Sequence, residues 1–151
     1  MIKVAFVRRD EQDRSANSKD YWLEQRGETD SWQFKHCYIL VGDKMITHTK
    51  HAPIVTIPAE ELEELLNNDG QPRVFIDLPI KGESIIKARK SIRVSHWVDR
   101  RGYARAWEHK FNPLAFAGIA YTCSNMVGKL LGWNDFYTLE SDDIYNRLTA
   151  K

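Results

Sequence analysis

Three residues of this chain carry side chains that could perform nucleophilic chemistry together: His36, His48 and Cys123. A thiol becomes a useful nucleophile when its pKa is lowered, and the usual means are a neighbouring imidazole and the N-terminus of a helix. Cys123 falls where a buried helix is expected to begin, and the two histidines lie in a predicted hairpin. If these elements converge in the fold, the pattern predicts a cysteine hydrolase or acyltransferase.

Each of these residues has an expected role. Cys123 would be the nucleophile, and His36 the base that takes the thiol proton and returns it to the leaving group. His48 is the candidate for the group that orients the imidazole, with Thr47 and Thr49 as alternatives. The backbone N–H of Cys123, unpaired at a helix N-terminus, could stabilise an oxyanion. No cofactor is required for this chemistry.

The elements that must position these residues follow from the apolar pattern. Alternation predicts strands at 2–7, 34–41, 45–49, 54–57 and 74–78. Helical spacing and end signals predict helices at 59–66, 123–131 and 141–148, the last one capped by Ser141. Residues 83–93 suit a short helix running into a strand, and the polar stretch 8–30 suits a long or partly helical loop. We expect one α+β domain over residues 1–151.

The loop of the predicted hairpin decides where His48 points. With a two-residue loop, Gly42–Asp43, His48 shares a strand face with Cys37 and not with His36. With a three-residue loop, His48 lies diagonal to His36, within side-chain reach. The catalytic arrangement therefore requires an odd loop or a bulge. Tyr38 shares the face of His36.

The motifs resemble those of a known superfamily. The stretch 36–48, HCYILVGDKMITH, is similar to the histidine hairpin of NlpC-like papain-fold cysteine hydrolases, in which a His-x-x-Ile-x-x-Gly strand carries the base. The stretch 121–127, YTCSNMV, resembles the nucleophile helix of the same superfamily. Here the histidine precedes the cysteine, which is the order of the circularly permuted branch. Two positions depart from the pattern: Cys37 replaces a small apolar residue, and Asn125 stands where that branch often has an acidic one.

This resemblance implies a papain-like fold, with an antiparallel sheet packed against a helix that bears the nucleophile Cys123 at its N-terminus. It implies attack of the thiolate on an amide, ester or thioester through an acyl-enzyme. Across the superfamily the substrates are peptides, protein conjugates and lipid acyl groups, and the residues do not select among them. Tyr38 and Tyr121 are candidate substrate-binding residues.

Composition sets the wider limits. The chain has 151 residues, a formal net charge of +1 and 11% aromatic residues, so no global field attracts nucleic acid or an anionic membrane. The longest apolar run, 114–121, is too short to cross a bilayer. No signal peptide is visible and cysteine is rare, so we expect a cytoplasmic protein. A protein packaged in a virion or released by lysis would have the same composition.

Other interpretations of the same residues stay open. Cys123 could be an inert core thiol, Cys37 core filler, and the two could form a disulfide, although strand alternation and a reducing compartment disfavour this. His48 and His51 could be surface histidines. The Cys and His residues together could suggest zinc, but their spacing fits no recurring zinc framework.

The stretch 87–110 carries an alternative function. It contains eight basic residues interleaved with Trp97, Tyr103 and Trp107, a mixture typical of surfaces that bind single-stranded nucleic acid or another anionic partner. A solvated face is the simpler interpretation. The stretch could also flank the catalytic site, with Arg100 and Arg101 in an exposed turn that attracts an anionic substrate.

Overall fold

The computed structural model describes residues 1–9, 33–70, 72–95 and 110–150. In this part of the chain, five strands form one antiparallel sheet in the order β4-β3-β2-β1-β5. The strands are β1 (Ile2–Arg8), β2 (Phe34–Val41), β3 (Lys44–Ile46), β4 (Ile54–Thr56) and β5 (Arg73–Leu78). The α+β class expected from the sequence is confirmed.

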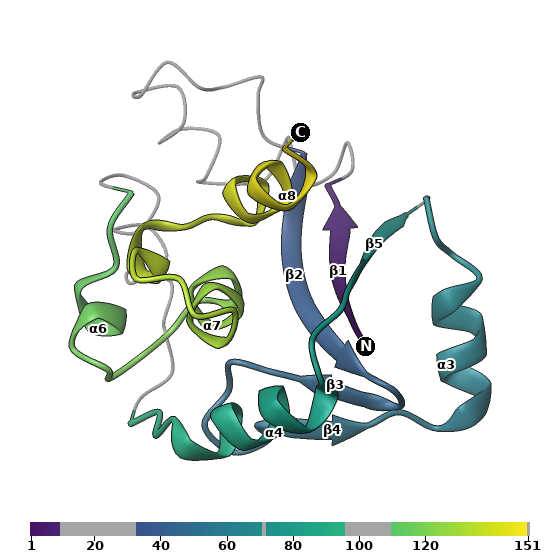
Figure 1. Cartoon of the computed structure of the whole chain (residues 1–151), viewed down its shortest axis with the longest axis horizontal. Coiled ribbons are helices and arrows are strands. Elements are labelled where there is room, and N and C mark those ends of the chain that lie inside the picture. Colours follow the sequence, from purple (N-terminus) through teal and green to yellow (C-terminus); the bar gives the residue numbers. More distant parts are fainter. Residues whose placement is uncertain (10–32, 71, 96–109, 151) are drawn as a thin grey trace.

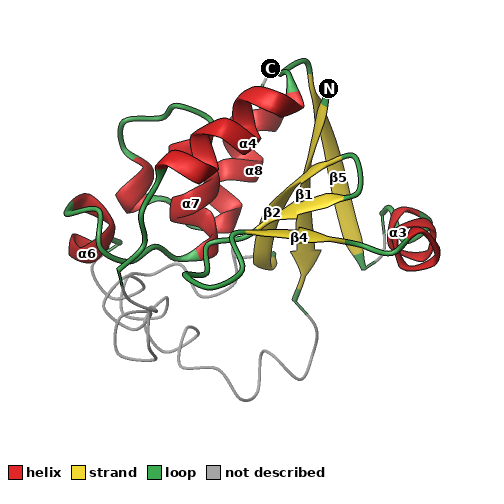
Figure 2. Ribbon diagram, turned by 90° about the horizontal axis from the view of Figure 1, so that it is seen from below, coloured by secondary structure: helices red, strands yellow, loops and turns green. Residues whose placement is uncertain are grey.

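Five α-helices and one short 3₁₀ helix accompany this sheet in the described residues. They are α3 (Ala59–Leu66), α4 (Gly82–Ser91), α6 (Pro113–Phe116), α7 (Cys123–Leu130), η1 (Phe136–Thr138) and α8 (Ser141–Thr149). Helices α4, α7 and α8 lie on one face of the sheet, and α3 lies alone on the other (Figures 1 and 2). The helix-rich face therefore holds the larger core.

The alternation of β1 and β2 explains how both faces are filled. Val4, Phe6 and Ile39 point into the core beneath the helices, and Ala5, Tyr38 and Leu40 pack on the side of α3. The register slips where Arg8 pairs with Phe34 after Val7 has paired with His36, which leaves Lys35 as an extra residue. This bulge lets both Phe34 and Cys37 face the helices.

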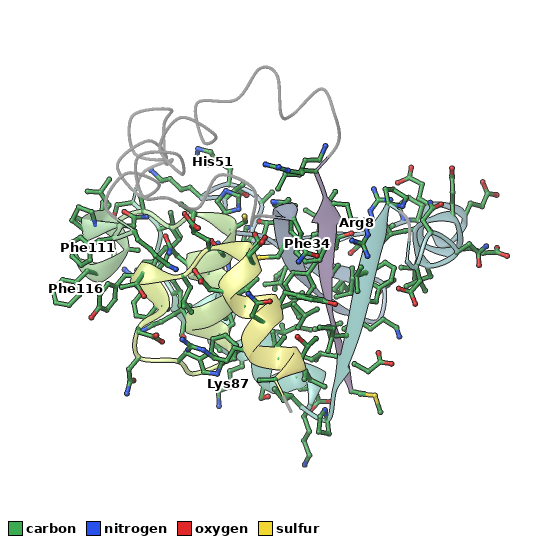
Figure 3. All side chains as sticks on the ribbon, turned by 90° about the horizontal axis from the view of Figure 1, so that it is seen from above. Arg8, Phe34, His51, Lys87, Phe111 and Phe116 are labelled. Carbon is green, nitrogen blue, oxygen red and sulfur yellow. The ribbon has the colours of Figure 1, made fainter. Side chains whose placement is uncertain are left out.

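Helix α8 fixes the beginning of β2. The carboxylate of Asp142 accepts hydrogen bonds from the backbone N–H groups of Gln33 at 2.7 Å and Phe34 at 2.9 Å. The ring of Phe34 also packs against the guanidinium of Arg8, 5.6 Å from the ring centroid (Figure 3). The strand that carries His36 is thus anchored two residues before that histidine.

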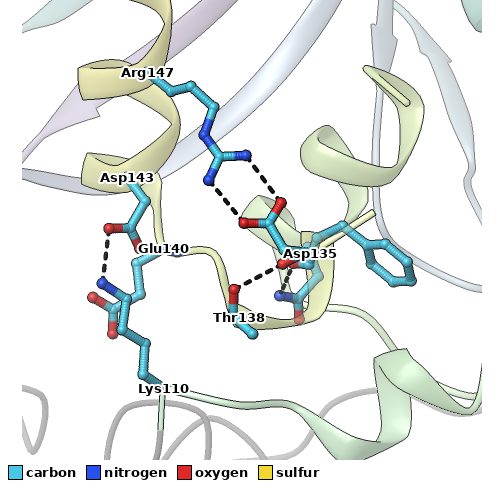
Figure 4. A network of polar contacts seen from close by, with 8 residues as sticks. Lys110, Asp135, Thr138, Glu140, Asp143 and Arg147 are labelled. Atoms are coloured by element: carbon cyan, nitrogen blue, oxygen red, sulfur yellow. Dashed lines mark hydrogen bonds and ion pairs between the residues drawn. The ribbon is translucent and has the colours of Figure 1, made fainter. Parts of the chain in front are cut away.

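Ion pairs hold α8 to the segments around it (Figure 4). Arg147 donates two hydrogen bonds to Asp135, at 2.9 and 2.8 Å, and Lys110 donates one to Asp143 at 2.8 Å. The other oxygen of Asp143 accepts the backbone N–H of Glu140. Glu140 and not Ser141 is therefore the N-cap of α8, which corrects the sequence prediction, because the Glu140 side chain reaches the first turn.

Two predicted strands differ from the structure. The strand expected at 45–49 ends at Ile46. In the segment 83–93, expected to run from a helix into a strand, the helix forms as part of α4 but residues 92 and 93 form no strand. The first difference affects the site, because the β2–β3 ladder ends at the pair Ile39–Ile46. Residues 36–38 of β2 therefore have no β3 partner. The expected loop at 8–30 lies outside the described residues beyond Arg9.

Candidate active site

Helix α7 begins at Cys123 in a closed capping arrangement. The N-cap Thr122 accepts a hydrogen bond from the backbone N–H of Asn125, and the Asn125 side chain accepts the backbone N–H of Thr122 at 3.1 Å. This reciprocal pair is a capping box, with Asn in the third helical position. The N–H groups of Cys123 and Ser124 lie in the first turn and have no intrahelical acceptor.

Asn125 has a second task that a carboxylate could not perform. Its amide nitrogen donates to the carbonyls of Phe136 at 2.9 Å and Leu139 at 3.4 Å. Its oxygen accepts from the buried Asn112 at 2.8 Å, so the amide is fully used. An acidic residue here has no N–H to donate. Asn125 therefore stands at this position for a structural reason: its amide fixes the start of α7 against the chain that follows the helix.

His36 and Cys123 meet at the part of β2 that β3 leaves unpaired. Burial lowers the pKa of the half-buried His36, but the charge of Cys123 and a hydrogen bond to it outweigh burial, so the pKa lies above 6.5. The pKa of Cys123 is held well below 9.0 by a hydrogen bond from Cys37, against the effect of burial, and by the charge and hydrogen bond of His36. Both shifts favour the charged forms of the two side chains, thiolate for Cys123 and imidazolium for His36.

His48 lies beside this pair although the hairpin has a two-residue turn. Val41 pairs with Lys44 across Gly42 and Asp43, and Gly42 has the positive φ of 60° that such turns use. The expectation that an odd loop or a bulge was required is wrong. Strand parity no longer applies after Ile46, where β3 ends, so the ring of His48 reaches 6.4 Å from that of His36, centroid to centroid.

Burial and the charges of His36 and Arg89 lower the pKa of His48, despite the opposing charge of Cys123. The neutral form of the His48 imidazole is therefore favoured, whereas the shift at the neighbouring His36 favours the charged form. A neutral ring has one nitrogen that donates a hydrogen bond and one that accepts, so it can accept a hydrogen bond from a neighbouring imidazole N–H, as an orienting group must.

Arg89 holds the backbone that carries His48, and the sequence did not single it out. This buried guanidinium donates to the carbonyl of Thr47 at 2.7 Å and to that of Thr49 at 2.9 Å, on either side of His48. A third hydrogen bond goes to Ile92 at 3.1 Å. Arg89 was counted among the basic residues of 87–110, and the structure removes it from any solvated basic surface. Arg89 lies four residues after Ile85 and three before Ile92, and this helical spacing is a signal that could have predicted its place on the inner face of α4.

The two threonines considered as alternative orienting groups serve the same loop. Their hydroxyls lie 2.9 Å apart, and both donate to the carbonyl of Ala52. The backbone N–H of Thr47 also donates to Pro53 at 2.9 Å. Thr47 and Thr49 line the site, but their hydroxyls are used in shaping the bend around His48.

Cys37 is buried and close to the nucleophile candidate. The structure places it in the helix-side core, as expected, and its thiol donates a hydrogen bond to Cys123. Both cysteines are free thiols. Alternation along β2 predicted that Cys37 and His36 point apart, but Cys123 lies at the strand edge and contacts both.

A cavity of about 150 Å³ opens from these side chains. Its lining combines polar residues, among them the two histidines, with apolar residues from β2, β3 and α7. The lining consists of His36, Cys37, Tyr38, Ile39, Met45, Ile46, Thr47, His48, Thr49, Cys123, Met126, Val127 and Leu130.

Of the four candidate substrate-binding residues, one lines the cavity, one does not, and two lie outside the described residues. Tyr38 lines the cavity, and its hydroxyl accepts a hydrogen bond from Arg73. Tyr121 is 4% exposed, does not line the cavity and packs near Phe136. Arg100 and Arg101 lie outside the described residues, as do Trp97, Tyr103 and Trp107. His51 is exposed, as a surface histidine would be (Figure 3).

The described residues contain no group of three or more His, Cys, Asp or Glu side chains arranged to hold a metal ion. None of their helices is long and apolar enough to cross a membrane.

No protein-family model, curated protein or solved structure matches the chain. The case for a function therefore depends on the residues and contacts described above.

Proposed function

We propose that this protein is a thiol-dependent hydrolase or acyltransferase with a papain-like fold of the permuted NlpC type. Cys123 is the nucleophile, His36 the base and His48 the orienting group. The observation that carries the proposal is the contact between Cys123, at the start of α7, and His36 on β2, with opposite shifts of their pKa values. Activated cysteines pair with an imidazole in this way.

The chemistry follows from these positions. The Cys123 thiolate attacks the carbonyl carbon of an amide, ester or thioester, and the oxyanion that forms accepts a hydrogen bond from the backbone N–H of Cys123. The His36 imidazolium gives its proton to the leaving group. In the second step, neutral His36 takes a proton from water or another acceptor nucleophile. That nucleophile attacks the acyl-enzyme and releases the thiolate.

Alkylation with iodoacetamide tests the activated thiol without knowledge of the substrate. At mildly acidic pH, Cys123 should react much faster than Cys37, as mapped by mass spectrometry. His36→Ala should slow the reaction of Cys123 about 100-fold there, because the thiolate loses its partner. His36→Ala is also compared with its parent in a Cys37→Ala background, which leaves one thiol to follow. Slow labelling of Cys123, no faster than that of a free thiol of ordinary pKa, would refute the proposal.

A second candidate, a binding module for an anionic partner, keeps one observation in its favour. An open depression of about 580 Å³ is lined in part by Lys50, Lys90 and Arg93, all exposed. Exposed basic side chains around a hollow attract phosphates, and such binding weakens steeply with salt. Replacement of Lys90 and Arg93 by Glu should abolish binding of a single-stranded oligonucleotide at low salt. Absence of any binding by the unaltered chain would end this candidate.

A further inference from the structure

The cavity beside Cys123 has a shape and lining that restrict what the thiol can accept, and the inference drawn from it rests on the proposed function. Helix α7 contributes Cys123, Met126, Val127 and Leu130 to the lining. These positions follow the spacing of one helical face. The cavity therefore extends from the thiol along α7, and this helix lies beside β2 (Figure 1). About 10 Å of helix axis separate Cys123 from Leu130.

The wall beyond the thiol is apolar on both sides. Ile39 and Ile46 come from the β2–β3 hairpin, opposite Val127 and Leu130 of α7. All four are less than a tenth exposed and carry no hydrogen-bonding group in their side chains. A hydrocarbon that enters between them exchanges water for apolar surface, which is favourable.

A peptide would find few partners in this cavity. The hydroxyls of Thr47 and Thr49 both donate to the carbonyl of Ala52. From Ile39 onward the backbone of β2 is paired with β1 on one edge and β3 on the other, so unpaired backbone groups of β2 remain only near the thiol. Peptide N–H and C=O groups buried without hydrogen bonds carry a large penalty. The group that follows the scissile carbonyl into the cavity is therefore hydrocarbon rather than peptide backbone.

The volume limits the length of that hydrocarbon. The cavity measures about 150 Å³. An apolar protein cavity of about this volume takes up one benzene molecule, which has six carbon atoms. We propose that the cavity accepts the unbranched acyl chain of the substrate, up to about six carbons counted from the scissile carbonyl, and that Leu130 closes its far end.

The reaction on such a substrate can be written in full for an ester probe. The Cys123 thiolate forms a C–S bond to the acyl carbon, the C–O bond to the leaving group breaks, and the His36 imidazolium gives its proton to the departing oxygen. The released p-nitrophenol then ionises in solution to the coloured p-nitrophenolate, and His36 is left neutral. Water then adds to the acyl carbon, its proton passes to His36, and the C–S bond breaks to restore the thiolate. The products are p-nitrophenolate and a carboxylic acid, with no oxidant or reductant involved.

A chain-length series of p-nitrophenyl esters tests the proposal. The rate of p-nitrophenolate release is measured for acetate, butyrate, hexanoate, octanoate and decanoate, each divided by its rate with glutathione. Burial of a methylene contributes about fourfold, so the four additional methylenes of hexanoate should raise kcat/KM about 200-fold over acetate. It should fall for octanoate and decanoate, which exceed the cavity. A flat profile, or one that rises through decanoate, overturns the inference.

Two variants locate the preference in this cavity. Val127→Phe fills it and should remove the advantage of hexanoate over acetate, measured as the ratio of the two kcat/KM values in the same variant. Leu130→Ala lengthens it and should move the optimum toward octanoate or decanoate. Circular dichroism shows whether each variant folds. If neither folds, the profile of the unaltered chain decides alone. Folded variants with unchanged profiles overturn the assignment to this cavity.

One matched ester separates an acyl chain from an amino-acid side chain. The p-nitrophenyl ester of N-acetylnorleucine has the six-carbon chain of hexanoate with an amide at the second carbon. Hexanoate should react faster, and faster reaction of the norleucine ester overturns the acyl assignment in favour of a peptide. Iodoacetamide labelling of Cys123 is followed in parallel. Rapid labelling with a flat ester profile leaves the proposed function standing and removes only this inference, whereas slow labelling removes both.

Discussion

His36 and His48 lie side by side, but two different kinds of structure position them. His36 belongs to β2, where the ladder to β1 fixes its backbone through the pair with Val7. His48 lies beyond the end of β3, in a bend without regular secondary structure. The sheet holds one imidazole, and the guanidinium of Arg89 holds the backbone around the other.

This difference shows how a site can combine a rigid part with one that depends on a single side chain. The β1–β2 ladder distributes the position of His36 over many backbone hydrogen bonds. The bend at His48 depends on Arg89 and the two flanking threonines, so its geometry is more sensitive to substitution. The predictions below change first the histidines, then the guanidinium, then the second thiol.

The largest effect should come from His36 and a smaller one from His48. His36→Asn removes the base and the partner of the thiolate, and should lower kcat/KM for the preferred ester about 1000-fold. His48→Asn leaves the base in place and disturbs only its orientation, so we expect a loss of up to about 100-fold. Burst kinetics with p-nitrophenyl hexanoate measure both. Equal losses would mean that the two imidazoles share one role and that the comparison is wrong.

The same pair of variants should differ in pH dependence. In the unaltered chain, alkylation of Cys123 should persist well below pH 9.0, the ordinary pKa of a thiol, because that pKa is lowered. Loss of the His36 proton ends the ion pair only above 6.5, because the pKa of His36 is raised. His36→Asn should move the acid limb to higher pH, and His48→Asn should move it less. An acid limb that His36→Asn leaves in place would contradict the ion pair.

Much of the fold was predictable because local signals agreed with tertiary structure. The strand at 34–41 and the helix at 59–66 have the predicted boundaries. The apolar alternation of β2 is matched by core on both faces, and Pro58 and Asn67 mark the ends of α3. The strand at 45–49 was predicted too long because its pattern continues after Ile46, whereas the Arg89 hydrogen bonds turn the backbone away.

Arg89→Met should affect the His48 side of the site and spare the His36 side. It removes three hydrogen bonds to backbone carbonyls, which should lower the free energy of unfolding by about 3 kcal/mol. Movement of the bend should reduce kcat by about 30-fold with little change in KM, since the cavity wall from α7 remains. Urea unfolding and ester kinetics measure the two quantities.

Lys90→Met is the matched control, because it removes a neighbouring charge that is exposed on the same helix. It should change neither quantity appreciably. Arg89→Lys should recover part of the stability but little of the rate, because an ammonium cannot reproduce the planar fork that reaches both carbonyls. If Arg89→Met lowers stability while the His48 ring signals and kcat stay unchanged, Arg89 stabilises the fold without positioning His48.

The candidate site was less predictable than the fold, for physical reasons that these residues show. Spacing and residue type were enough to select His36 and Cys123, which the structure brings into contact. The role of Arg89 depends on the carbonyls of Thr47 and Thr49, which lie 42 and 40 residues earlier in the chain. Strand parity failed for His48 because parity holds only within a ladder. Cys37 contacts Cys123 because that thiol lies at a strand edge, which alternation does not describe.

The smallest effect should come from Cys37, which contacts the thiol of Cys123 but does not hold His36 or His48 in place. Its thiol donates a hydrogen bond that helps to lower the pKa of Cys123. Cys37→Ala should slow alkylation of Cys123 about tenfold at mildly acidic pH and leave the rate at alkaline pH unchanged. Cys37→Ser keeps a hydroxyl donor of similar size, so its alkylation rate should lie between those of the unaltered chain and Cys37→Ala. If the acid limb is unchanged in Cys37→Ala, the lowered pKa of Cys123 is due to the imidazoles and not to the Cys37 thiol. The thiol would then be activated mainly by His36, the histidine that the β1–β2 ladder holds in place.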